Sequence, residues 1–242
     1  MSVVVCKIVE SKSVAGRIIF RKKGRPSMNK ITISILAALL IPLAGCDWHG
    51  IRGNRVITTE QRTIGAFANI EADGTFQIEW KSGVPALSIT TDQNLLPYIK
   101  SEIRGDKLRL HSDEHLAPTH GIKVLVSGAA LSGAQFRGAV RFSAHQISGA
   151  NFFLESRGAA RITLDGKVGE LTAGMTGASK LMAESLQTDR AELSLTGASR
   201  AEVNVTDTLK VSITGAGKVV YSGNPRRVER DVTGAGTIRA KE

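Results

Sequence analysis

Apolar and polar residues alternate with a period of two through much of the C-terminal half of the chain. The segments 191–196, 201–206 and 209–214 each place an apolar residue at every second position, with mostly polar residues between them. This period is typical of β-strands that bury one face and expose the other. The period and the glycine content, 25 of 242 residues, exclude a long α-helix here. The pattern therefore predicts short strands.

These strands recur with a Gly-Ala pair about every 19 residues. The pairs begin at positions separated by 20, 19, 20, 18 and 19 residues: Gly138, Gly158, Gly177, Gly197, Gly215 and Gly234. So narrow a period indicates one supersecondary unit stacked on itself. Glycine suits a turn at this point because it adopts positive φ and allows close approach of neighbouring backbones. We therefore predict two short strands per unit, with Gly-Ala at one turn.

Two all-β arrangements satisfy this repeat. In a parallel β-solenoid, stacked coils require the same residue class at each position of the coil, as the repeat shows. An antiparallel β-sandwich or prism is the alternative, although hairpin arrays seldom keep so constant a period. We predict the solenoid, preceded by an N-terminal β cap.

The cap is expected over residues 56–126, and the Gly-Ala-repeat solenoid of the same domain over residues 127–242. Strand-like patterns in the cap occupy residues 55–59, 67–72, 76–80, 86–91, 100–104 and 108–111. Residues 92–99 contain the one stretch that favours a helical turn. The cap is therefore predicted to be almost entirely β as well.

The order of motifs in residues 56–240 resembles a family of bacterial envelope domains described as auto-transporter adhesin heads (GIN domains), whose function is unknown. The shared features are Phe-Ala-Asn-Ile-Glu-Ala at 67–72, Asp92 followed by Asn-Leu-Leu, Lys-Leu-Arg-Leu at 107–110, and the Gly-Ala-rich repeats. The resemblance implies an all-β domain on the bacterial envelope. It transfers no catalytic residue.

Residues 1–45 read as a leader. Lys30 precedes an apolar run over residues 31–42, which has signal-peptide proportions and is too short for an ordinary membrane-spanning helix. The run ends in Leu-Ala-Gly-Cys, which resembles the bacterial lipobox and makes Cys46 the lipidated first residue of the mature protein. Residues 46–55 would be a lipidated tether. Met28-Asn29-Lys30 resembles a natural start, so residues 1–27 are either an over-extended start or a long leader.

Charge and cysteine content change once this leader is set aside. The chain carries a net charge of +10, but eight basic residues and one acidic residue lie in residues 1–45, which leaves +3 from Cys46 onward. The basic balance therefore does not indicate a nucleic-acid partner. Cys6 also lies in the leader, so the mature protein forms no intramolecular disulfide. Asp47 resembles the inner-membrane retention signal of enterobacterial lipoproteins. This resemblance favours the periplasmic face of the inner membrane, with the outer membrane as the alternative location.

A basic residue follows most of the Gly-Ala pairs three positions after the glycine. This column consists of Arg141, Arg161, Lys180, Arg200 and Lys218. In a parallel solenoid these cations lie about 4.8 Å apart. Either Asp165, Glu184 and Glu202 neutralise them within the protein, or the column is a positive stripe that binds anionic glycan, lipopolysaccharide or phospholipid headgroups.

Three of the five histidines lie close together with two carboxylates between them. A zinc or nickel ion would have as candidate ligands His111, Asp113, His115 and His120. Their spacing fits no established catalytic signature, and Pro118 marks an exposed loop. We therefore expect a polar connection here, and no metal or other cofactor.

The chain contains no nucleophile elbow and no phosphate-binding glycine loop. We expect a non-enzymatic envelope lipoprotein that acts as a binding or scaffold module for an envelope polymer or protein, anchored to the membrane through Cys46. The alternative is a carbohydrate-active enzyme, a glycosidase or lyase, that uses carboxylates on the solenoid face. The charged segment 224–231 is expected to cap the C-terminal end of the solenoid.

Overall fold

The computed structural model describes residues 50–241. Cys46, Asp47 and the leader lie outside the described residues. The described part consists of β-strands and one short 3-10 helix, η1 (Gln93–Tyr98), which confirms the predicted helical turn. No helix within residues 50–241 is long and apolar enough to cross a bilayer.

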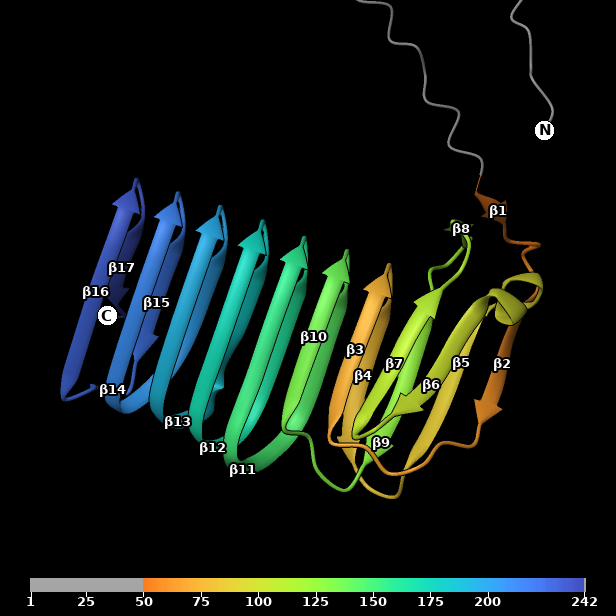
Figure 1. Ribbon diagram of the computed structural model, residues 1–242, viewed down its shortest axis with the longest axis horizontal. Helices are drawn as coiled ribbons and strands as arrows, with labels where there is room; N and C mark the ends of the chain where they lie inside the picture. Colours follow the sequence, from red (N-terminus) through yellow and green to blue (C-terminus); the bar gives the residue numbers. More distant parts are fainter. Residues whose placement is uncertain (1–49, 242) are drawn as a thin grey trace, which may run out of the picture. The chain divides into compact units, whose positions relative to one another are not determined.

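The repeat folds as a parallel β-solenoid, which confirms the predicted fold. Four long strands each make most of one coil: β11 (Arg141–Gly158), β12 (Arg161–Gly177), β13 (Lys180–Gly197) and β14 (Arg200–Gly215). Each pairs in parallel with the next, so that residues with the same place in the repeat lie opposite one another. The coils lie side by side in chain order (Figure 1).

Each long strand bends once and so contributes to two layers of strands, which pair in parallel through the coils. Layer one contains the ends of the long strands, together with β6 (Ile99–Arg104), β7 (Lys107–Ser112), β3 (Asn69–Gly74), β10 (Gly133–Gly138) and β16 (Arg227–Gly234). Layer two contains their beginnings, together with β2 (Ile57–Arg62), β5 (Ala86–Asp92), β9 (Lys123–Gly128), β4 (Gln77–Ser82), β15 (Lys218–Ser222) and β17 (Thr237–Ala240). The front and back strands of each coil are visible in Figure 1.

The core lies between the two layers. In β13, for example, Leu181 and Ala183 point inward from layer two, and Leu193 and Leu195 point inward from layer one. Aliphatic residues fill most of this space, while the larger aromatic side chains, Trp80 among them, lie toward the N-terminal end. The alternation seen in the sequence thus has the expected physical cause, because every second side chain faces a shared apolar interior.

The glycines of the repeat form one corner of the solenoid. All six have positive φ, and so does Gly74, which lies opposite Gly138 as a seventh member of the column. In the first five pairs, the amide of the alanine after the glycine donates to the glycine carbonyl of the preceding coil, as from Ala159 to Gly138 over 3.0 Å. Since β3 and β4 pair in parallel with β10 and β11, the stacked coils extend into residues expected as the cap.

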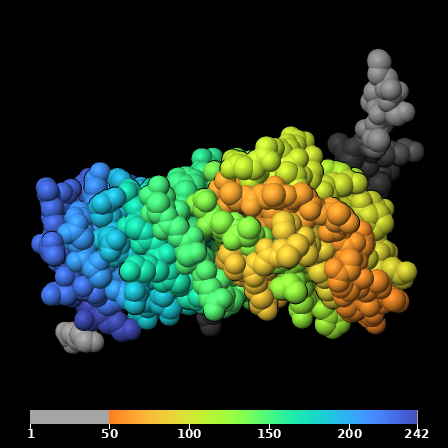
Figure 2. Space-filling view, turned by 90° about the horizontal axis from the view of Figure 1, so that it is seen from below, coloured from red at the N-terminus to blue at the C-terminus, as the bar shows by residue number. Residues whose placement is uncertain are grey.

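The N-terminal end differs because its strands do not follow one another in chain order. β5 pairs antiparallel with β2 and with β9, while β9 pairs in parallel with β4. The two-residue strands β1 (Ile51–Arg52) and β8 (Leu116–Ala117) also pair in parallel. Figure 2 shows these N-terminal segments gathered at one end of the described part, followed by the coils in order of colour.

Asp92 fastens the first described residues to this end. Its buried carboxylate accepts hydrogen bonds of 2.8 Å from the amide of Arg55 and from both the amide and the hydroxyl of Thr119. Burial raises the pKa of this carboxyl, but these hydrogen bonds outweigh burial and the pKa of Asp92 is lowered.

At the C-terminal end, Arg230 lies over the last coil. On β14 the corresponding residue is the buried Val211, so Arg230 occupies an inward-facing position. Its guanidinium lies 6.0 Å from the ring centroid of Tyr221 and donates to the Tyr221 hydroxyl over 2.9 Å. An inward-pointing charge on a terminal strand hinders further strand addition, which agrees with the expected end cap.

Candidate functional site

The predicted basic column exists as a straight ladder on the outer face of layer two. Arg141 lies opposite Arg161, Arg161 opposite Lys180, Lys180 opposite Arg200, and Arg200 opposite Lys218. The ladder begins directly after the glycine corner, because the fixed corner places the third residue after each glycine at the start of the next strand. We call these five residues the basic ladder.

Carboxylates neutralise only one member of the basic ladder within the described residues. Glu202 contacts Lys180 over 3.4 Å. The other two expected partners bind elsewhere: Asp165 pairs with His145 over 2.6 Å, and Glu184 pairs with Lys241 over 3.0 Å. Of the two alternatives for the column, neutralisation by Asp165 and Glu184 is therefore not what the ion pairs show. Across residues 50–241, the remaining four cations of the ladder form no ion pair.

The outer face of layer one provides a contrast. There, basic residues have acidic neighbours, as in the pairs Arg157–Glu155 over 2.6 Å and Lys210–Glu192 over 2.9 Å. Arg109 lies between two carboxylates, 3.6 Å from Glu71 and 3.7 Å from Glu102. One face thus balances its charges locally, whereas the other concentrates unpaired positive charge in one line.

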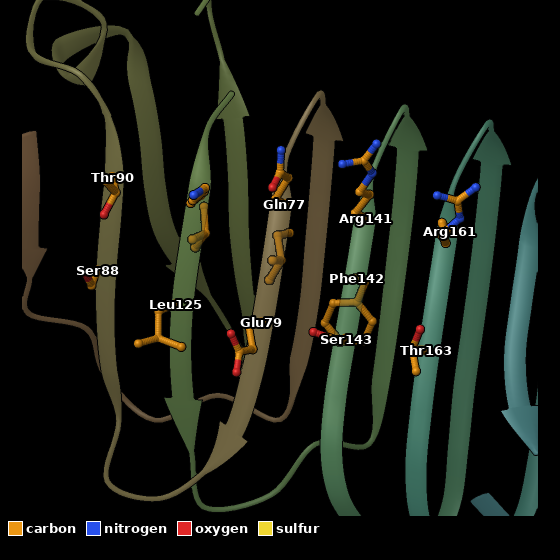
Figure 3. Close-up of a pocket in the computed structure, with 13 residues that line it drawn as sticks. Gln77, Glu79, Ser88, Thr90, Leu125, Arg141, Phe142, Ser143, Arg161 and Thr163 are labelled. Carbon is orange, nitrogen blue, oxygen red and sulfur yellow. The ribbon is translucent and has the colours of Figure 1, made fainter. Parts of the chain in front are cut away.

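A groove of about 520 Å³ opens at the N-terminal end of the basic ladder. Figure 3 shows its lining residues on five neighbouring strands: β5, β9, β4, β11 and β12. Ten of these residues form a grid of two rows. The first row is Thr90, Lys123, Gln77, Arg141 and Arg161. The second row is Ser88, Leu125, Glu79, Ser143 and Thr163.

Sequence reasoning found only Arg141 and Arg161 among these ten residues. One signal was available for Gln77, which follows Gly74 by three positions and so occupies the same place in the coil as the basic ladder. Lys123 and Leu125 had no such signal, because β9 follows β4 by some forty residues and pairs with it only in the folded protein.

The histidine cluster does not converge on one point. His111 Nε2 lies 3.5 Å from Asp113 Oδ1, whereas His120 Nδ1 lies 3.0 Å from the Thr119 hydroxyl. The carbonyl oxygen of His115 accepts a hydrogen bond from the amide of Ile51 over 2.8 Å. In the part of the chain that the structure describes, no three histidine, cysteine or acidic side chains form a group that could hold a metal ion.

Among residues 50–241, the pKa is lowered for two carboxyl groups, those of Asp92 and Asp165. Asp92 is described above. For Asp165, burial raises the pKa, but hydrogen bonds from the Gln146 amide and His145, together with the His145 charge, outweigh burial. A glycosidase needs a general acid whose pKa is raised. Neither Asp92 nor Asp165 has this property, and both hold local structure instead.

Four cations in one line, unpaired within the described residues and beside an open polar groove, mark the outer face of this β-solenoid. The sequence profile of the family described as "Putative auto-transporter adhesin, head GIN domain" matches residues 66–225. The chain belongs to this family, which confirms the resemblance seen in the sequence. No curated protein sequence matches this chain significantly.

Comparison with solved structures gives one that shares the fold and others that superpose less well. A "putative adhesin" from Bacteroides fragilis superposes with a TM-score of 0.64 at 18% identity, over 79% of this chain and all of that one. A "putative lipid binding protein" from Parabacteroides distasonis gives a TM-score of 0.49 at 20% identity, over 79% of this chain and 99% of that one. A "putative adhesin" from Parabacteroides merdae gives 0.46 at 19% identity with the same coverage. At these identities the first structure supports the fold alone.

Proposed function

We propose that this protein is a non-enzymatic, adhesin-like module of the bacterial envelope, which binds an anionic envelope polymer through the basic ladder. Membership of an adhesin-head family supports a role at the bacterial surface or envelope. The proposal further includes a membrane anchor, formed by lipid on Cys46.

The observation that carries this proposal is the charge of the four ladder cations without an ion pair among residues 50–241: Arg141, Arg161, Arg200 and Lys218. Two unit charges about 4.8 Å apart repel each other by about 1 kcal/mol in water. The protein therefore keeps an arrangement that is unfavourable without a counter-charge, although the other layer shows that local pairing is available to this fold. An extended polyanion lying along the coils would relieve the repulsion at several positions together.

Charge reversal of the ladder tests the proposal. In Lys180→Glu/Arg200→Glu, affinity for an anionic polymer such as polygalacturonate should fall at least tenfold, and wild-type binding should weaken with added salt. The matched control is Arg157→Glu/Lys210→Glu, which makes the same charge change on layer one and should alter affinity less than twofold. Equal loss in both double variants, or no loss in the first, would contradict binding through the ladder.

The rival activity is cleavage of the bound polymer by surface carboxylates. The lowered pKa values of Asp92 and Asp165 make these two carboxyls unsuitable as the general acid of such a cleavage. Prolonged incubation of the protein with polygalacturonate should release no new reducing or unsaturated ends. Their appearance at a rate above that of a heat-treated sample would overturn the non-enzymatic proposal.

The anchor is tested separately from binding. The wild-type protein produced in bacteria should carry the mass of a diacylated or triacylated N-terminal cysteine, and it should fractionate with membranes. Cys46→Ala should lack this mass and leave the membrane fraction, because the variant has none of the acyl chains that give stable anchoring. A wild-type protein whose N-terminus carries no lipid would exclude the anchor.

A further inference from the structure

The groove differs chemically from the remainder of the basic ladder. Its first row carries three cations: Lys123, Arg141 and Arg161. Its second row supplies the hydroxyl groups of Ser88, Ser143 and Thr163, together with the carboxylate of Glu79 and the half-exposed side chain of Leu125. Cationic and hydrogen-bonding groups therefore line the groove in two parallel rows, as Figure 3 shows for the labelled residues.

Glu79 restricts what this groove can bind. It lies on the strand next to Ser143 and opposite Leu125, in the middle of the second row. A carboxylate at this point repels a ligand that is uniformly anionic, such as a polyphosphate chain. It accepts hydrogen bonds from hydroxyl groups, which a sugar supplies. The groove thus favours a ligand with negative charge on one edge and hydroxyl groups on the other.

Arg141 and Arg161 suit the charged edge of such a ligand. They lie opposite each other on adjacent strands, and neither forms an ion pair within the described residues 50–241. Guanidinium groups bind carboxylates through two parallel hydrogen bonds. Beside them, Gln77 offers an amide that both donates and accepts, and Leu125 offers apolar area for the C–H face of a sugar ring.

We infer that the groove binds a uronic acid unit, a sugar that carries a carboxylate, within an anionic glycan. Arg141 and Arg161 hold the carboxylate, while Glu79, Gln77 and the hydroxyl groups of the second row bind the sugar hydroxyls. The volume, about 520 Å³, lies within the range of about 300–1,000 Å³ typical of small-molecule sites. This inference rests on the proposed function and names the ligand class that the first coils of the ladder select.

The test compares two polyanions on the full-length protein in a non-ionic detergent. Polygalacturonate carries carboxylates and hydroxyls, whereas inorganic polyphosphate carries charge without sugar hydroxyls. Glu79→Gln should weaken binding of polygalacturonate about tenfold and leave polyphosphate binding unchanged or tighter. Arg141→Ala/Arg161→Ala should weaken polygalacturonate binding by more than tenfold.

A matched control separates the Glu79 carboxylate from its ion pair. Glu79 pairs with Lys81 over 2.9 Å, and both side chains are about half exposed, so the pair itself contributes little to stability. Lys81→Gln removes the same pair but keeps the carboxylate, and it should bind polygalacturonate within twofold of wild type. An equal loss in Lys81→Gln would overturn the role of Glu79.

The outcomes distinguish this inference from the proposed function. If Glu79→Gln lowers the affinity for both polymers equally, or for neither, the groove does not recognise a uronic acid. Binding that still depends on Lys180 and Arg200 would then leave the proposed function standing. If wild-type protein binds neither polymer, both the inference and the proposed function are wrong.

Discussion

The carbonyl oxygen of Gly177 lies so close beneath Gly197 that a β-carbon on Gly197 would come within 2.7 Å of it. The same oxygen accepts the amide of Ala198 over 2.8 Å. Gly197 also has a φ of 98°, which L-residues with a side chain rarely adopt. The corner of the coil therefore requires glycine both for space and for backbone conformation.

Gly197→Ala should lower the free energy of unfolding by about 1–3 kcal/mol, the usual cost of a strained backbone position. The control is Gly174→Ala on β12, where a β-carbon would meet nothing within 4 Å. This control should be neutral or stabilising by about 0.4–1 kcal/mol. Denaturant titration followed by the fluorescence of the buried Trp80 measures both. Equal losses in the two variants would contradict a special requirement at the corner.

Asp165 should make the solenoid sensitive to acid. Its carboxylate accepts the amide of Gln146, a residue with positive φ at the bend of the preceding coil, over 2.6 Å. Because the folded-state pKa of Asp165 lies below the ordinary value of 3.8, its stabilising contribution is complete above that pH. The contribution is lost as the pH falls below 3.8 through the folded-state pKa.

Asp165→Asn should therefore be less stable than wild type at pH 7, and its stability should fall less steeply below pH 3.8. Denaturant titrations at a series of pH values check this expectation. Asp231→Asn, at an exposed position on β16, serves as the control and should keep the wild-type slope. An unchanged slope in Asp165→Asn would show that this carboxyl does not contribute to acid unfolding.

Asp92→Ala should loosen the first described segment. The amides of Arg55 and Thr119 would lose a charged acceptor, and a hydrogen bond to a charged group contributes about 1.5–3 kcal/mol. Trypsin should then cleave after Arg55 faster than in wild type. Asn94→Ala removes exposed hydrogen bonds to Asn54 and Arg52 in the same segment and should have a smaller effect. Protection from trypsin equal to wild type would contradict the role of Asp92.

Arg230→Val should allow the C-terminal ends of two molecules to associate. The variant would replace an inward-facing charge by an apolar residue on a terminal strand, whose backbone groups remain available for pairing. Light scattering should show a mass that rises with concentration. Arg226→Val, in an exposed turn, removes one positive charge without opening the end and should behave as wild type. Equal association of both variants would point to reduced charge as the cause.

Much of the fold could be predicted from the sequence, because a solenoid repeats the same local requirements in each coil. The glycine of the repeat marks a corner, and the third residue after it begins the next strand. For that reason the repeat by itself predicts one register, which the strand pairing confirms, for Arg141, Arg161, Lys180, Arg200 and Lys218.

The partners of those cations could not be predicted, since they depend on side-chain directions at the bends. Asp165 is close to the ladder in sequence and in the coil, yet it binds the bend of the preceding coil through His145 and Gln146. Asp165 and Glu184 have similar positions in the repeat. Asp165 nevertheless binds a backbone amide, whereas Glu184 binds the cation Lys241.

By itself, therefore, the sequence determined the parallel coil and the straight column of basic residues, and lipidation of Cys46 stays a prediction. The tertiary structure alone decided that most of the column is unpaired and that a groove adjoins its first coils. Lys123 and Leu125 reach that groove because β9 inserts between β5 and β4, out of chain order. Pairing between strands far apart in sequence leaves no local pattern, so only the folded chain brings these residues to one site.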